Sequence, residues 1–118
     1  MNIVDICICF SEGRFKEIYP YFSDDIKWEV IEDTKLEGKD SVIQRCEQIE
    51  KYFSSIQTNF VTLNVIYNDL KVSINGTAEF IKDRKLVSFI SACDIYEFDE
   101  NHKIKNITSY CISKDLSK

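Results

Sequence analysis

One acidic residue lies in the middle of an apolar stretch that is typical of a buried strand. Asp94 follows Phe89 and Ile90, and in a strand it shares one face with Ala92 and Tyr96. A buried carboxyl group is costly unless it is hydrogen-bonded or kept protonated. Because such a group can exchange a proton with a ligand, Asp94 is the candidate general acid or base of this sequence. The alternative is that it bonds a neighbouring tyrosine or backbone N–H group and tunes the pocket without doing chemistry.

The other reactive side chains form no second centre. The cysteines are odd in number, fit neither a zinc ribbon nor a C-x-x-C pair, and lie mostly in apolar stretches. The sequence therefore predicts buried, reduced thiols and a cytoplasmic protein. Two cysteines near the start and one histidine in a charged loop, His102, are too few ligands for a metal site, so we expect neither metal nor cofactor. The five cysteines are Cys7, Cys9, Cys46, Cys93 and Cys111.

Length and charge restrict the class of protein. The chain has 118 residues, which fits one domain covering residues 1–118. The net charge is −5 and no basic cluster exists, which argues against nucleic acid and against a membrane surface as partners. No apolar stretch approaches the roughly 18 residues of a membrane span. Residues 1–10 lack the positive flank of a signal peptide.

The first half of the sequence has mainly helical patterns. Residues 3–10 are ambiguous, because their β-branched side chains favour a strand while their apolar residues run all round, as in a buried helix. The next segment fits one face of a helix that Pro20 should end or kink. Its apolar residues are Phe15, Ile18, Tyr19 and Phe22.

A turn at residues 23–25 and a short strand at residues 26–30 are expected to follow. Residues 37–41 then open the best helix of the chain, with Asp40 near the positive end of the helix dipole. Its apolar residues step by four, three, four and three and form one stripe: Val42, Cys46, Ile49, Phe53 and Ile56.

The second half has the alternating pattern of strands. We expect strands at residues 60–67, 70–81, 86–98 and 103–113. Turns are predicted at Asn68-Asp69, at Asp83-Arg84 and at residues 99–102, and Gly76 should mark a bulge or bend. Three short connections in a row predict an antiparallel meander.

The strand at residues 86–98 is apolar on both faces, so both should be covered. Because the helices can cover only one face, we expect the other to meet a second subunit in a homodimer. One face carries Ile90, Ala92, Asp94, Tyr96 and Phe98, and the other carries Val87, Phe89, Ser91, Cys93 and Ile95.

The order of helices followed by a meander resembles the NTF2-like superfamily, and within it the small SnoaL-like and ketosteroid-isomerase-like proteins. The resemblance spans nearly the whole chain and is carried by residues 10–18 (FSEGRFKEI) and 22–28 (FSDDIKW), residues 36–43 (LEGKDSVI), and residues 93–99 (CDIYEFD) with 103–110 (KIKNITSY). It implies an α+β, cone-shaped (cystatin-like) fold in which N-terminal helices pack on a strongly curved mixed or antiparallel sheet and leave a pocket. It also implies dimers formed through the outer face of the sheet.

The resemblance gives Asp94 a specific role. In ketosteroid isomerases the aspartate of the matching strand is a protonated acid that hydrogen-bonds the substrate oxygen, and carried over, Asp94 would donate to a carbonyl oxygen as an enol forms. The isomerase base falls on Val30 and the isomerase tyrosine on Ile6, so the familiar residue set is incomplete. Glu29 and Glu32 flank Val30, but strand alternation sends Glu29 to the opposite face.

Two relatives of the same fold are set aside. Epoxide hydrolases of this fold look to use an Asp–Arg–Asp set on these strands, whereas this chain has no arginine after Arg84. Dehydratases need two histidines, and this chain has one. Around Asp94 we expect a mainly aromatic pocket for a flat apolar ligand, with the Tyr19 and Tyr96 hydroxyls as partners of the carboxyl group. The expected ligand-binding residues, each of which could instead be ordinary core, are Tyr19, Phe22, Trp28, Phe53, Ile90, Ala92, Tyr96, Ile107 and Ser109.

Three functions remain open at the level of the sequence. The first is an isomerase or cyclase without metal or nucleotide that acts on an apolar carbonyl compound through Asp94. The second is a binding module that holds a small apolar ligand without converting it. The third is a protein-interaction or dimerisation unit, because this fold hosts many activities.

Overall fold

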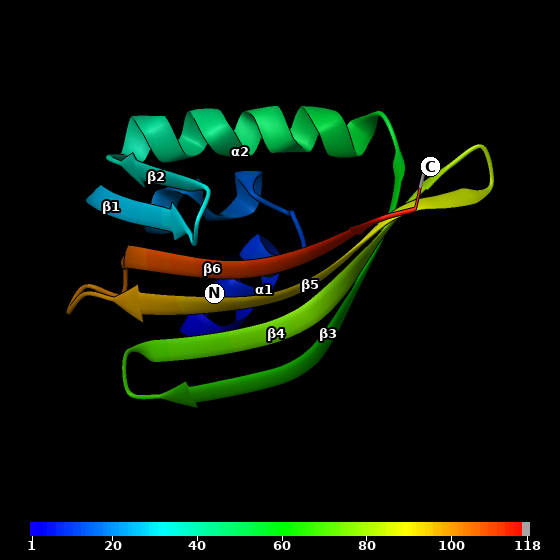
Figure 1. The fold of residues 1–118 in the computed structure, drawn as a ribbon. Coiled ribbons are helices and arrows are strands. Elements are labelled where there is room, and N and C mark those ends of the chain that lie inside the picture. Colours follow the sequence, from blue (N-terminus) through cyan, green and yellow to red (C-terminus); the bar gives the residue numbers. More distant parts are fainter. Residues whose placement is uncertain (117–118) are drawn as a thin grey trace.

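The protein is one six-stranded sheet with two helices and a short 3-10 helix, seen in a computed structural model that describes residues 1–116 (Figure 1). The strand order is β2-β1-β6-β5-β4-β3, and the curled sheet does not close. The predicted α+β fold with a mixed, curved sheet is therefore confirmed. In chain order the elements are α1 (Ile3–Ser11), η1 (Lys16–Tyr21), β1 (Phe22–Val30), β2 (Thr34–Glu37), α2 (Lys39–Ser54), β3 (Gln57–Asn68), β4 (Lys71–Lys82), β5 (Lys85–Phe98) and β6 (Ile104–Asp115).

Strands β3 to β6 form the predicted antiparallel meander, and β6 then pairs in parallel with β1. The β4–β5 connection is the predicted two-residue turn, in which Asp83 and Arg84 have φ angles of 52° and 65°. Two consecutive positive φ angles are those of a type I′ turn, which matches the twist of a hairpin. The β3–β4 turn lies one residue later than expected, at Asp69 and Leu70.

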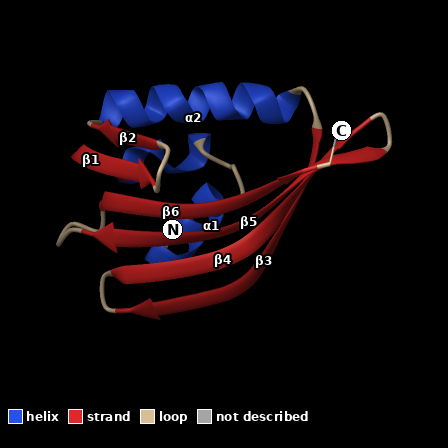
Figure 2. Ribbon diagram, viewed as in Figure 1, coloured by secondary structure: helices blue, strands red, loops and turns tan. Residues whose placement is uncertain are grey.

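Gly76 marks the place where the sheet is irregular, as predicted. The β3–β4 register shifts between Thr62 and Asn64, next to Gly76 on β4. A Cβ atom on Gly76 would lie 2.3 Å from the carbonyl oxygen of Val61. Only glycine allows this close approach of two backbones, and a bulge bends the strand that carries it. The strands curve along their length in Figures 1 and 2.

The N-terminal third resolves one open point of the sequence analysis and differs from the expectations in two places. Residues 3–10 are helical, and the Asn2 side chain caps α1 by accepting a hydrogen bond from the Asp5 N–H group. The expected helix over Phe15 to Phe22 is the 3-10 helix η1, because Pro20 allows no longer α-helix and Phe22 already pairs with Ile104. The turn expected at residues 23–25 is part of β1.

The helices lie on one side of the sheet (Figure 2), and the core is between them and the inner strand face. The apolar stripe of α2 is confirmed over most of its length: Val42 and Cys46 are buried, whereas Ile49 and Phe53 are half-buried. Ile56 lies beyond the end of the helix. The edge strand β2 was not predicted, because four residues of mixed polarity give too short a pattern.

Candidate functional site

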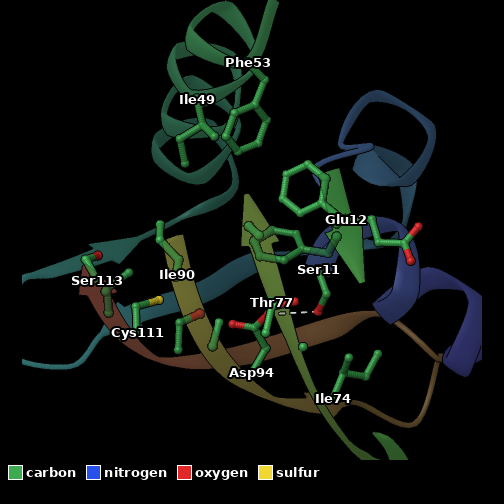
Figure 3. A pocket seen from close by; sticks show the side chains of 18 of the residues that line it. Ser11, Glu12, Ile49, Phe53, Ile74, Thr77, Ile90, Asp94, Cys111 and Ser113 are labelled. Carbon is green, nitrogen blue, oxygen red and sulfur yellow. Dashed lines mark hydrogen bonds between the residues drawn. The ribbon is translucent and has the colours of Figure 1, made fainter. Parts of the chain in front are cut away.

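A cavity of about 410 Å³ lies between α2 and the inner face of the sheet. Ile49 and Phe53 of α2 cover it from above, and Asp94, Ile90 and Cys111 lie across from them on the sheet side (Figure 3). Six predicted ligand-binding or catalytic residues line this cavity: Trp28, Phe53, Ile90, Ala92, Asp94 and Ser109. The other four, Tyr19, Phe22, Tyr96 and Ile107, do not line it; their ligand-binding roles, like those of the first six, remain predictions.

The cavity exists because small residues occupy neighbouring positions on three adjacent strands. Gly76, Ala92 and Cys111 are direct neighbours across β4, β5 and β6, and all three line the cavity. Large side chains in this row would fill the space, because protein interiors otherwise pack without voids. The next row holds Ile74, Asp94 and Ser109. Within this row the polar groups are the Asp94 carboxyl group and the Ser109 hydroxyl group.

Asp94 is bound by hydroxyl groups from three elements. Ser11 Oγ, at the end of α1, donates to Asp94 Oδ2 over 2.8 Å (the dashed line in Figure 3), and the Tyr96 hydroxyl oxygen lies 3.4 Å from the same Oδ2. Ser109, directly opposite on β6, also hydrogen-bonds the carboxyl group. The Trp28 indole N–H donates to Ser109 Oγ over 3.0 Å, which leaves the Ser109 hydrogen free for Asp94.

Burial and hydrogen bonding act on Asp94 in opposite directions. Burial raises the pKa of the Asp94 carboxyl group above its ordinary value of 3.8, and this is the largest effect. The hydrogen bonds from Ser109, Ser11 and Tyr96 lower that pKa, because they stabilise the charged form. The net result is a raised pKa, which is what a group that exchanges protons near neutral pH needs.

Of the two tyrosines predicted to bond the Asp94 carboxyl group, Tyr96 does so and Tyr19 does not. Tyr96 is fully buried and bonds Asp94 and Ser11, as the alternation of β5 requires. The Tyr19 hydroxyl, by contrast, is buried without a hydrogen-bond partner among residues 1–116, and its ring packs against Phe22.

Ser11 was missed as a functional residue. The sequence shows it within a family-like segment, but its bond to Asp94 joins positions 83 apart, and no local pattern announces such a contact. The signal that could have found it is its place at the end of an apolar helix. A serine one residue after a buried aromatic, Phe10, must lie close to the core.

Two further carboxylates, Glu12 and Asp33, line the cavity. Glu12 is bound by Arg14 over 3.0 Å and by the Thr62 hydroxyl over 3.1 Å, and in Figure 3 its carboxylate points away from Asp94. Val30, the residue onto which the resemblance to ketosteroid isomerases places their catalytic base, lines the cavity. Glu29 and Glu32 do not line it.

Metal ligands do not gather in the described part of the chain: no group of three or more His, Cys, Asp or Glu side chains could hold an ion there. All five cysteines are free, and Cys111 is the one that lines the cavity. Burial raises the pKa of the Cys111 thiol, so it is uncharged near neutral pH. Among residues 1–116, no helix combines the length and apolar character needed to span a bilayer.

The comparisons with known proteins agree with this architecture. No protein-family model and no curated protein matches the sequence significantly. A solved NTF2-like protein from Cytophaga hutchinsonii is 35% identical, with a TM-score of 0.82 over 92% of this chain and 94% of that chain. An α+β cone with a pocket between helix and sheet is the architecture of this class of protein, and at this level of identity and coverage the chain belongs to the NTF2-like family.

More distant structures share the fold alone. A SnoaL-like protein from Burkholderia thailandensis is 11% identical with a TM-score of 0.66, over 94% of this chain and 89% of that one. An LEH-like epoxide hydrolase from M. tuberculosis is 14% identical with a TM-score of 0.67, over 93% of this chain and 82% of that one. The Asp–Arg–Asp set expected of such hydrolases has no counterpart here, because the one arginine that lines the cavity, Arg45, comes from α2.

Proposed function

We propose that this protein binds a small, flat, apolar carbonyl compound in the cavity, and that Asp94 exchanges a proton with it as a general acid or base. The observation that carries the proposal is the position of Asp94. Its carboxyl group lies half-buried in the wall of a mainly apolar cavity that several aromatic rings line, and burial raises its pKa. Solved structures with this fold include candidate ketosteroid isomerases and polyketide cyclases, which supports the same class of reaction.

Asp94 could serve the reaction in either protonation state. As a neutral acid it donates a hydrogen bond to the carbonyl oxygen and stabilises the developing enol. As a carboxylate it removes an acidic proton next to the carbonyl group; the electron pair of that C–H bond becomes the C=C bond of the enolate, and the C=O π pair moves onto the oxygen. Neither step needs a metal or an organic cofactor, and we propose that none takes part.

Ligand binding can be followed with the protein's own fluorescence. Trp28 is the one tryptophan of the chain and lines the cavity, so a ligand there changes the emission directly. We suggest 2-tetralone as the probe, since it is a flat apolar ketone with acidic protons beside its carbonyl group. Hydrogen–deuterium exchange of those protons in D2O, followed by NMR, measures the proton transfer.

The decisive variant is Asp94→Asn. We expect it to bind 2-tetralone like the wild type and to lose the accelerated exchange by about 10²-fold or more, the usual contribution of a positioned acid or base. The matched control is Asp83→Asn, in the β4–β5 turn, where asparagine tolerates the positive φ angle. Binding without any exchange in the wild type would favour the non-catalytic binding module, and no binding would exclude both functions.

We also propose a homodimer through the outer face of the sheet. The outer face of β5 and β6 exposes three large apolar side chains: Ile112 is 76% exposed, Tyr110 47% and Ile95 37%. Neighbouring exposed apolar side chains of this kind mark interaction surfaces. The five free thiols support a reducing, cytoplasmic location. The net charge of −5 supports small-molecule and protein partners over nucleic acid.

A further inference from the structure

Ser11, the last residue of α1, hydrogen-bonds two polar side chains, those of Asp94 and Tyr96. Its Oγ donates to Asp94 Oδ2 over 2.8 Å and also hydrogen-bonds the Tyr96 hydroxyl. A serine hydroxyl group has a single hydrogen, and the bond to Oδ2 uses it. Tyr96 is therefore the donor in its contact with Ser11, and it shares its hydrogen between Ser11 Oγ and, over the longer 3.4 Å contact, Asp94 Oδ2. The hydrogens are ordered from Tyr96 to Ser11 to Asp94, an arrangement in which each bond strengthens the next.

This order makes the two carboxyl oxygens of Asp94 unequal. Each oxygen has two lone pairs, and on Oδ2 these face Ser11 and, over the longer 3.4 Å contact, Tyr96. A proton on Oδ2 would have to displace one of these two contacts, because both lone pairs already face a hydroxyl group. Oδ1 is therefore the oxygen that gains and loses the proton.

We propose that Ser11 is a positioning residue for the proton transfer at Asp94, which holds Oδ2 so that Oδ1 is presented to the ligand. This inference rests on the proposed function, because it assumes that Asp94 exchanges a proton with a bound compound. Ser11 acts through Asp94. The reacting atoms are Asp94 Oδ1 and the ligand, and the proton that leaves the ligand carbon ends on Oδ1.

The position of Ser11 is itself fixed by the fold. Helix α1 is anchored by the buried residues Ile6, Cys7 and Phe10, so Ser11 cannot retreat from the sheet without exposing them. The titratable groups that face Asp94 are Cys7 of α1, Tyr96 of β5 and Cys111 of β6. Burial raises the pKa of each, so all three are neutral near neutral pH, and burial together with the hydroxyl groups decides the state of Asp94.

The test uses Ser11→Ala, with Ser11→Thr as the variant that keeps the hydroxyl group. The matched control is Ser54→Ala, which removes an exposed hydroxyl group on α2 away from the cavity. Two quantities are measured: the titration of the Asp94 carboxyl carbon by ¹³C NMR, assigned with Asp94→Asn, and the exchange of 2-tetralone above the midpoint of that titration. Trp28 emission gives the dissociation constant of the probe.

We expect Ser11→Ala to move the titration midpoint of Asp94 upward by about one pH unit, as for the loss of one hydrogen bond to a charged group. We expect exchange to slow by about 10- to 100-fold from misorientation while binding stays within twofold. Ser11→Thr should restore both quantities, and Ser54→Ala should change neither.

The outcomes separate the two claims. If Asp94→Asn abolishes exchange while Ser11→Ala exchanges like the wild type, the positioning role is wrong and the proposed function stands, whether or not the midpoint moves. If Asp94→Asn exchanges like the wild type, the proposed function itself is wrong. A Ser11→Ala variant that loses binding and exchange together, without rescue by threonine, would make Ser11 a packing residue and overturn the inference.

Discussion

The competition between burial and hydrogen bonding at Asp94 predicts how the stability of the protein depends on pH. In the unfolded chain Asp94 titrates near its ordinary value of 3.8, whereas burial raises its pKa in the folded protein. Between these two values the folded state holds the proton and the unfolded state does not. The unfolded state then binds fewer protons, so the free energy of unfolding must fall as the pH rises. Above the folded pKa the effect levels off.

The slope can be given without knowing the size of the shift. One proton at one site changes the free energy of unfolding by at most about 1.4 kcal/mol per pH unit. The total loss is that slope multiplied by the distance between the two pKa values. The pH at which the curve flattens therefore reports the folded pKa of Asp94 directly.

Urea unfolding, followed by Trp28 emission between pH 4 and pH 8, measures this slope in the wild type and in Asp94→Asn. All other titrating groups are common to both proteins, so the difference between the two curves isolates Asp94. We expect that difference to fall with rising pH and then to become constant. A difference that stays constant across this range, or that rises only near pH 4, would mean that the hydroxyl donors outweigh burial and that the pKa is not raised, which would refute the reasoning.

Two further predictions concern the sheet. Gly76→Ala should lower the free energy of unfolding by about 1–3 kcal/mol, since its Cβ would lie 2.3 Å from the Val61 carbonyl oxygen and the backbone must move; urea unfolding checks this, and wild-type stability would contradict it. Ile112→Lys, which places a charge on the outer face, should convert the proposed dimer to a monomer in sedimentation experiments, with Lys114→Ala on the same strand as the control. A dimer that survives this change would place its interface elsewhere.

The sequence predicted the strand half of the fold well because its signals are local. The alternation along β5 placed Asp94 and Tyr96 on the inner face, and the turn at Asp83 and Arg84 follows from residues that tolerate a positive φ angle. The irregularity at Gly76 could also be predicted, because a glycine inside a strand indicates a bulge or a close approach of two backbones.

The parts that could not be predicted depend on how distant segments meet. Residues 3–10 fit both a helix and a strand, and the packing that decides for the helix, with four of its residues buried in the core, exists only in the folded chain. The partner of Asp94 on α1 depends on where that helix crosses the sheet, so Ser11 stayed hidden. Tyr19 was expected beside Asp94, but the place of its hydroxyl group depends on how the short 3-10 helix around Pro20 packs, which the sequence does not give.

The alternation of β5 and β6 also keeps two kinds of change apart. Ala92 and Asp94 face the hollow, while Cys93 and Ile95, which alternate with them, face outward. Natural variation at one set of positions can reshape what the hollow accepts without touching what covers the opposite side. The two properties can therefore evolve independently on the same pair of strands, provided that no insertion or deletion shifts the register by one residue.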